Sequence, residues 1–156
     1  MDSRLIDASD HGDTKAVKTL LAAGANVHVE DDCALRWAAC RGYTETVKAL
    51  LAAGANVHAR DDEAMRGAAD CGYTETMQAL ARHIFAPDSW YGKSRGEIEA
   101  AAEALYHRII AENPHPDHLR QAGSILLDCA LCCWEQVRPP PPKLQISPLP
   151  AQPRPA

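Results

Sequence analysis

Leu50-Leu51-Ala52-Ala53-Gly54-Ala55-Asn56-Val57-His58 repeats, without a change, the nine residues at 20–28. The two copies stand thirty residues apart. The words between them repeat as well, since 31–39 is closely matched by 61–69 and 42–46 returns unchanged at 72–76. Repetition at a fixed period of about 20–50 residues is typical of a solenoid, in which each unit stacks on its neighbour. The sequence therefore predicts a short repeat array.

Each unit has the pattern of two short helices joined by a glycine turn. In the second unit, 31–60, we expect Asp32 to cap an inner helix that Gly42 ends. Thr44 is expected to cap the outer helix, and Gly54 supplies the left-handed residue that closes it. The apolar residues of the outer helix recur at helical spacing on one face: Val47, Leu50 and Leu51.

The first and last units depart from this pattern. The first, 1–30, opens directly on a helix over 3–9, with Asp13 or Thr14 starting its second helix, so we interpret it as an N-terminal capping repeat. The third, 61–86, loses the glycine stop of its outer helix. That helix is expected to run on until Pro87 ends it.

The repeated words carry a resemblance to a known family. The inner helix, the Gly-Tyr turn, Thr-Glu-Thr-Val-Lys-Ala-Leu-Leu at 44–51 and the Gly-Ala-Asn-Val loop at 54–57 resemble the ankyrin repeat over roughly residues 4–86. The family period is about 33 residues, so the connection between units is three residues shorter here. Cys33-Ala34-Leu35-Arg36 and 63–66 replace the family's Thr-Pro-Leu-His, which leaves capping to Asp32 and Asp62. Short units of this kind are similar to ankyrin arrays of bacteria, phages and large viruses.

The chain after the repeats predicts a linker, two more helices and a tail. We assign 87–96 to the linker and 97–138 to a helical pair, which Ser94 and Glu97 open as a capping box. The first helix should end near Asn113 and the second should span 116–137. The pair is expected to cover the bare last face of the array, or alternatively to make a homo-oligomer contact through 116–137. The Pro-rich segment 139–156 predicts an extended tail, whose P-x-x-P spacings are an alternative polyproline ligand.

The composition excludes several classes of function. The net charge of −5 argues against a general nucleic-acid binder, which needs a basic face. No apolar run is long enough to cross a membrane, and the polar start, Met1-Asp2-Ser3-Arg4, is not a secretory signal. The six cysteines are therefore expected to be reduced thiols in a cytoplasmic protein, or in the host cytosol if the protein is a delivered effector. The predicted fold class is all-α.

The sequence contains little that indicates metal binding or catalysis. Cys129, Cys132 and Cys133 share a helix face, with His115 and His118 upstream, but a zinc site would need a second facing cluster. No phosphate-binding loop, paired catalytic carboxylates or nucleophile with a base appears. We therefore expect no cofactor, no metal and no enzyme activity. The alternative is that the C-terminal helices carry a metal-bound or catalytic activity and the repeats serve as a targeting module.

With catalysis and metal binding not expected, the remaining function is the binding of another protein. The resemblance to ankyrin repeats implies which surface the partner contacts. Partners of ankyrin-like arrays usually contact the connecting turns and the exposed side of the inner helices. Such a protein would be an adaptor, an effector or an inhibitor, for example a phage or bacterial anti-defence or immunity factor. Trp37 is either a binding anchor or packing between units. The predicted surface comprises Asp10, His11, Asp31, Asp32, Trp37, Cys40, Arg41, Asp61, Asp62, Glu63, Arg66, Asp70 and Cys71.

Overall fold

The computed structural model describes residues 1–111 and 116–139, and all regular structure within them is helical. The interpretations of His115 and of the proline-rich segment from residue 140 lie outside the described residues. The elements are α1 (Asp2–Asp10), α2 (Thr14–Ala22), α3 (Val29–Cys40), α4 (Thr44–Ala52), α5 (Ala59–Asp70), α6 (Thr74–Ile84), α7 (Pro87–Trp90), α8 (Arg95–Ile110) and α9 (Pro116–Val137).

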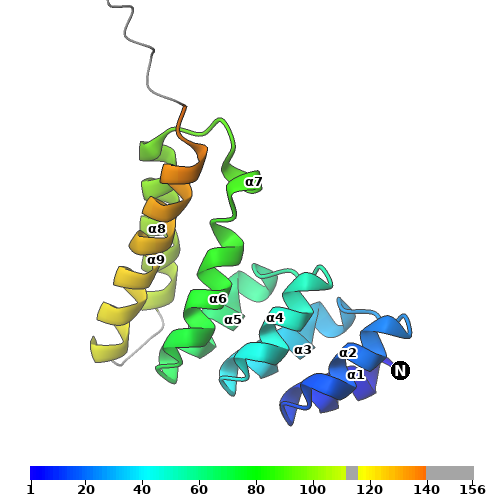
Figure 1. Cartoon of the computed structure of the whole chain (residues 1–156). Coiled ribbons are helices and arrows are strands. Elements are labelled where there is room, and N and C mark those ends of the chain that lie inside the picture. The colour runs from blue at the N-terminus through cyan, green and yellow to red at the C-terminus, as the bar shows by residue number, and fades with distance from the viewer. Residues whose placement is uncertain (112–115, 140–156) are drawn as a thin grey trace, which may run out of the picture.

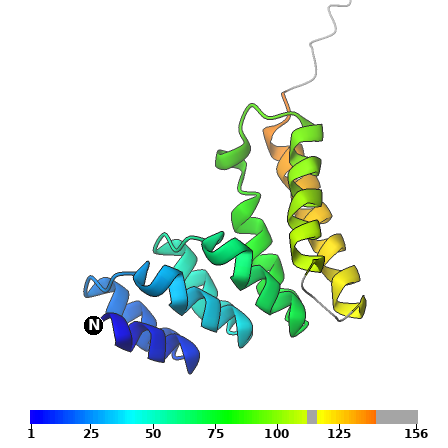
Figure 2. The same ribbon diagram turned by 180° about the vertical axis from the view of Figure 1, so that it is seen from behind.

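Three helical hairpins stack side by side, α1–α2, α3–α4 and α5–α6 (Figure 1). The odd-numbered helices form an inner row and the even-numbered helices an outer row. The α8–α9 pair follows at the end of the array next to α6. The axes of its helices are steeply inclined to those of the repeat helices, as the reverse view also shows (Figure 2). The prediction of an all-α solenoid followed by a C-terminal helical pair is confirmed.

The core of the array is thin because small residues let the inner helices approach closely. Six alanines of α3 and α5 are almost completely inaccessible to solvent: Ala34, Ala38, Ala39, Ala64, Ala68 and Ala69. The outer helices supply the larger side chains, among them the fully buried Val47, Leu50, Met77 and Leu80. The single phenylalanine, Phe85, is buried where the third unit ends. Burial of these side chains supplies most of the favourable free energy of folding.

The capping role predicted for Asp32 and Asp62 is wrong, because a left-handed turn precedes each inner helix. Glu30, Asp31 and Asp32 have φ of 51°, 55° and 55°, and the turn recurs at 60–62. The Asp32 carboxylate instead accepts the backbone N–H of Asn56 at 2.8 Å and lies 3.1 Å from His28 Nδ1. Neither inner helix has a side-chain cap.

Arg36 holds this left-handed turn together. Its guanidinium donates hydrogen bonds to the carbonyl oxygens of Glu30, at 3.1 Å, and Asp31, at 3.2 Å. Left-handed backbone costs about 1–2 kcal/mol for each residue other than glycine, so the turn needs such compensation. The side chain that replaces the family's histidine therefore closes the shortened connection between units. Arg66 repeats part of the arrangement with a bond to the Arg60 carbonyl oxygen at 3.2 Å.

The outer helices are linked by hydroxyl pairs, which corrects the capping role predicted for Thr44. Thr44 Oγ1 lies 2.8 Å from Thr76 Oγ1, and Thr14 pairs with Thr46 at the same distance. Neither α4 nor α6 has a side-chain cap. In α2, by contrast, Asp13 accepts the backbone N–H of Ala16 at 2.9 Å, as one of the two predicted alternatives requires.

The N-terminal part of α9 contacts the third unit in the way that one outer helix contacts the previous unit. Tyr43 lies on Gly12 and Tyr73 lies on Gly42, so that a Cβ at either glycine would come within 2.7 Å of the ring. At Gly72, the third glycine of this series, the ring is His118, which also bonds the Asp70 carbonyl oxygen at 2.9 Å.

The hydroxyl pairs continue onto α9 in the same register. Thr74 donates to Gln121 Oε1 at 3.2 Å, where the earlier units have a second threonine. The aromatic residue and the threonine of each unit stand three positions apart, as at Tyr43 and Thr46, and His118 and Gln121 keep this spacing. Buried apolar residues then follow in α9 at the positions that are buried in α4 and α6: Ala122, Ile125 and Leu126. Thus α9 occupies the place of a further outer helix.

The connection to this pair differs in part from its prediction. The segment predicted as a linker contains the short helix α7, where Trp90 Nε1 donates to the Ile84 carbonyl oxygen at 2.8 Å. The Ser94–Glu97 capping box is present as predicted. The described part of α8 ends at Ile110, before the Asn113 predicted from the sequence. The boundaries assigned to the domains remain predictions.

Candidate protein-binding surface

Trp37 is the largest exposed side chain on the inner face of the array. Its side chain is 46% exposed, although the helix around it is buried. It lines a shallow hollow of about 500 Å³ together with Arg4, Ile6 and Asp10 of α1. A tryptophan packed wholly between units would lose this access to solvent. The indole therefore leaves a face available for contact.

The predicted surface residues at the C-terminal ends of the inner helices are partly connected to this hollow through Asp10, which lines it. Arg41 Nη2 lies 3.1 Å from Asp10 Oδ1 and joins the first two units. Cys40 lies against Gly67 of α5, and burial, followed by nearby Cys71, raises the pKa of the Cys40 thiol. Asp70 and Cys71 are exposed at the matching end of the third unit.

His11 lies beside this group at the first glycine turn. Its Nδ1 is 2.8 Å from the Asp7 carbonyl oxygen, and this backbone hydrogen bond, together with the Asp7 charge, raises the pKa of the exposed imidazole. The charged form is therefore favoured more than in an isolated histidine.

A second group lies toward the N-terminal ends of α3 and α5. Arg36 Nη1 lies 2.6 Å from Glu63 Oε2, and Arg60 Nε lies 3.8 Å from the same oxygen. Asp31 and Asp61 are exposed in the left-handed turns. Positive and negative side chains alternate in this group, and the Glu63 carboxylate lies close to both Arg36 and Arg60. It is a polar surface at the opposite end of these helices from Cys40 and Asp70.

Asp32 and Asp62 do not contribute to the accessible surface. They are only 4% and 1% exposed, and their carboxylates are engaged within the protein. Asp62 Oδ1 lies 2.5 Å from His58 Nδ1, and its other oxygen lies 2.9 Å from Arg108 Nη2. Both aspartates therefore have a structural role and are not accessible to a partner.

The sequence was compared with models of known protein families. The model described as ankyrin repeats in three copies matches residues 5–89, more than half of the chain. The protein belongs to the ankyrin-repeat family. A comparison with curated proteins finds no match. Ankyrin repeats are generally protein–protein interaction modules and typically non-catalytic.

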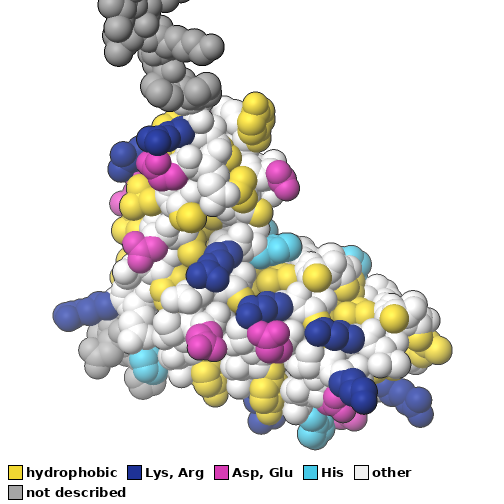
Figure 3. Space-filling model, in the orientation of Figure 1, with side chains coloured by type: hydrophobic (Ala, Val, Ile, Leu, Met, Phe, Trp, Pro, Cys, Tyr) yellow, Lys and Arg dark blue, Asp and Glu magenta, His cyan; other side chains and the backbone are white. Residues whose placement is uncertain are grey.

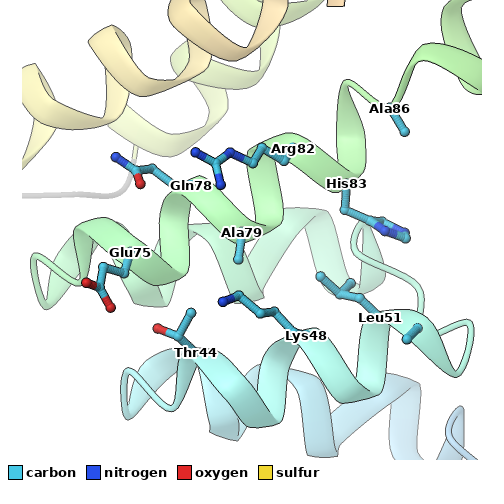
Figure 4. A pocket seen from close by; sticks show the side chains of 10 residues that line it. Thr44, Lys48, Leu51, Glu75, Gln78, Ala79, Arg82, His83 and Ala86 are labelled. Carbon is cyan, nitrogen blue, oxygen red and sulfur yellow. The ribbon is translucent and has the colours of Figure 1, made fainter.

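The outer face of the ankyrin array offers a different kind of surface. Lys and Arg side chains cross it in a row, with acidic side chains beside them (Figure 3). A groove of about 600 Å³ lies between α4 and α6, and Lys48 reaches into it (Figure 4). Lys48 is paired with Glu45 at 2.7 Å, and both are exposed. None of the predicted partner-binding residues lines this groove.

The C-terminal cysteines are poorly suited to hold a metal. Burial raises the pKa of the Cys129 and Cys133 thiols, whereas metal ligation requires thiolates. Within the described part of the chain, no group of three His, Cys, Asp or Glu side chains could hold a metal ion. Among the helices of residues 1–111 and 116–139, none is long and apolar enough to cross a membrane.

The sequence-based surface omitted four residues that line the hollow of the ankyrin array: Ser3, Arg4, Ile6 and Asp7. A comparison of the repeats contains the signal for Ile6, because the matching positions of the next units are Arg36 and Arg66. The first unit thus has an apolar residue where the next two units have arginine, and this residue lines the hollow with the exposed Trp37. The role of Arg36 in the turn was also missed, since it depends on backbone carbonyls whose direction the sequence does not specify.

Proposed function

We propose that this ankyrin-repeat protein binds another protein through the inner face of its array, with Trp37 as the central contact. The observation that carries the proposal is the half-exposed indole beside Ile6, in a hollow bordered by the Asp10–Arg41 ion pair. Aromatic and arginine side chains supply most of the energetically dominant contacts in protein interfaces. An apolar centre with charged groups around it is the usual composition of such a contact.

The partner class follows from the same surface. The negative net charge favours a protein over nucleic acid, and the mixed charges around Trp37 suit a partner with its own paired charges. We propose a non-catalytic role as an adaptor, effector or inhibitor in the cytoplasm or a host cytosol. The short repeats, which resemble those of bacteria, phages and large viruses, support a role such as an anti-defence or immunity factor.

We expect Trp37→Ala to weaken partner binding by at least about 2 kcal/mol, or roughly thirtyfold in Kd. Truncation would remove the apolar centre of the contact while leaving the buried helix packing in place. The experiment captures partners from the native host on the immobilised protein and identifies them. It then measures Kd by calorimetry for each purified partner against the wild-type and variant proteins.

Tyr91→Ala is the matched control, because Tyr91 is an aromatic residue, 84% exposed, that lies outside the inner face. Its removal should leave Kd unchanged, and circular dichroism should show equal helicity in both variants. Full affinity of the Trp37→Ala protein for every captured partner would contradict the proposal.

A second candidate function is self-association through α9. Leu127 is 49% exposed on that helix, and Leu131, one turn later, is only partly covered. If α9 forms a homo-oligomer, light scattering should give a mass above 16.9 kDa that returns to the monomer value in Leu127→Glu, since a buried unpaired charge opposes association. A monomeric mass for the wild-type protein at high concentration would remove this candidate.

A further inference from the structure

A pocket of about 530 Å³ lies at the corner where the array meets the C-terminal pair. Figure 3 shows this corner, with histidine side chains in cyan near its edge. Three parts of the chain form its walls: the loop after α4, the segment from the end of α6 through α7, and α8. Two of these three parts, α7 and α8, lie outside the regular repeat, so the pocket forms where the repeat pattern is interrupted.

Hydrogen-bond donors line the pocket from all three sides. His58 comes from the loop, His83, Ser89 and Lys93 come from the segment around α7, and Arg108 comes from α8. Among the described residues that line it, there is no Asp or Glu. In a chain with a net charge of −5, a concave site with basic side chains and no acidic lining is unusual, and it favours an anion.

Asp62 positions two of these donors from beneath the surface. The carboxylate is 1% exposed and lies 2.5 Å from His58 Nδ1 and 2.9 Å from Arg108 Nη2. With Nδ1 engaged, His58 Nε2 is the nitrogen available to a ligand. Arg108 keeps further N–H groups beyond the one directed at Asp62. In the second unit, the second partner of the Asp32 carboxylate is the backbone N–H of Asn56, whereas that of Asp62 is Arg108.

Lys93 can bind a ligand while giving up only a weak ion pair. Lys93 Nζ lies 3.5 Å from Glu97 Oε1, and both side chains are about half exposed. Ion pairs between exposed side chains contribute little to the stability of the folded state. A ligand anion can therefore replace Glu97 as the partner of the ammonium group without a large penalty.

The rest of the pocket wall is apolar. Ile84, Phe85 and Trp90 line it beside the donors, with Leu105 from α8. The Phe85 and Trp90 rings lie 5.7 Å apart, and Trp90 is fixed by its hydrogen bond to Ile84. A ligand that fills this pocket thus needs an anionic end and an apolar body.

We propose that this corner pocket binds the phosphoryl group of a phosphate monoester with an apolar body. The donors approach from three separate segments, which suits the tetrahedral arrangement of phosphate oxygens better than a planar carboxylate. Arginine and lysine are the usual phosphate-binding side chains, and a hydroxyl and imidazoles complete the set. The site is separate from the inner face around Trp37, so it stands or falls independently of the proposed function.

Phenyl phosphate is the probe, titrated into the full-length protein and followed by NMR. The expected result is saturable one-to-one binding with shifts of the His58 and His83 ring signals. Benzyl alcohol, which lacks the anion, should not bind. Benzoate should bind more weakly than phenyl phosphate, because a planar group reaches fewer donors. Absence of saturation by phenyl phosphate at millimolar concentration, or equal affinity for benzoate, would overturn the proposal.

Lys93→Gln tests the assignment without disturbing the buried Asp62 pairs. It should weaken phenyl phosphate binding about tenfold, the change that one charge-assisted hydrogen bond typically produces. Arg95→Gln is the matched control, since Arg95 is a neighbouring exposed cation paired with a glutamate four residues on, at Glu99, and does not line the pocket. Equal affinities of the two variants would place the binding elsewhere.

The phosphoryl group has two sources that the same assay separates. A phosphotyrosine peptide and its unphosphorylated form are titrated beside phenyl phosphate. Binding of the phosphopeptide at least as tight as that of phenyl phosphate, with loss in Lys93→Gln, points to a phosphorylated protein. Exclusion of the peptide while phenyl phosphate still binds points to a free metabolite. Either result keeps the phosphoryl site, whereas equal binding of the unphosphorylated peptide would refute it.

Discussion

Replacing Gly42 by alanine is expected to lower the free energy of unfolding by about 2–5 kcal/mol, a large fraction of the stability of a small domain. The new Cβ would lie 2.6 Å from Tyr73 Cδ1, so the ring or the turn must move. Displacing a packed group costs about 1–3 kcal/mol. The φ of +75° at Gly42 adds about 1–2 kcal/mol for a residue with a side chain.

Gly54→Ala separates the two causes. Gly54 has a φ of +92°, but no atom would lie within 4 Å of an added Cβ. Only the backbone cost applies, so we expect a loss of about 1–2 kcal/mol. Urea unfolding followed by circular dichroism measures both variants against the wild-type protein. Equal losses for the two glycines would show that the contact of Tyr73 with the preceding unit contributes nothing.

Removing α8 and α9 is the second change with a large expected effect. A chain that ends at Lys93 would uncover the contacts of α5 and α6 with the pair. Exposure of even two large apolar side chains costs about 3–6 kcal/mol, and the carboxylate of Asp62 would lose Arg108. We expect this chain to lose cooperative unfolding in urea and to bind a hydrophobic dye, because we propose that the pair covers the end of the array.

A chain that ends at Arg138 is the control for this truncation. It retains α9 and all of the contacts described above, and it should unfold at the same urea concentration as the full-length protein. Cooperative unfolding of the shorter chain at an unchanged midpoint would contradict the proposal that α8 and α9 cover the array.

Much of the fold could be predicted because repetition and glycine mark the same boundaries. The outer helices end before Gly24 and Gly54, and the inner helix of the second unit ends at Cys40, as the sequence indicates. The left-handed turn at 30–32 could not be predicted in this way. It places residues with side chains at positive φ, and it depends on carbonyl bonds from Arg36 that form only in the folded chain.

The register of α9 could not be predicted for a related reason. His118 and Gln121 differ in identity from the tyrosine and threonine whose places they take. Only the contacts with Gly72 and Thr74 reveal the equivalence. For the candidate surface, the sequence indicated Trp37 and its neighbours, but not that Asp32 and Asp62 turn inward. Their acidity suggested exposure, whereas hydrogen bonds to His28 and His58 bury them.

The most direct test of the central claim is a hydrogen-exchange footprint of the protein bound to its identified partner. If the inner face is the binding surface, amide protection should increase along the inner helices α1 and α3, around Trp37 and Arg41. The outer groove between α4 and α6 should exchange as in the free protein. Protection confined to that groove or to α9, with the amides around Trp37 unchanged, would contradict the account.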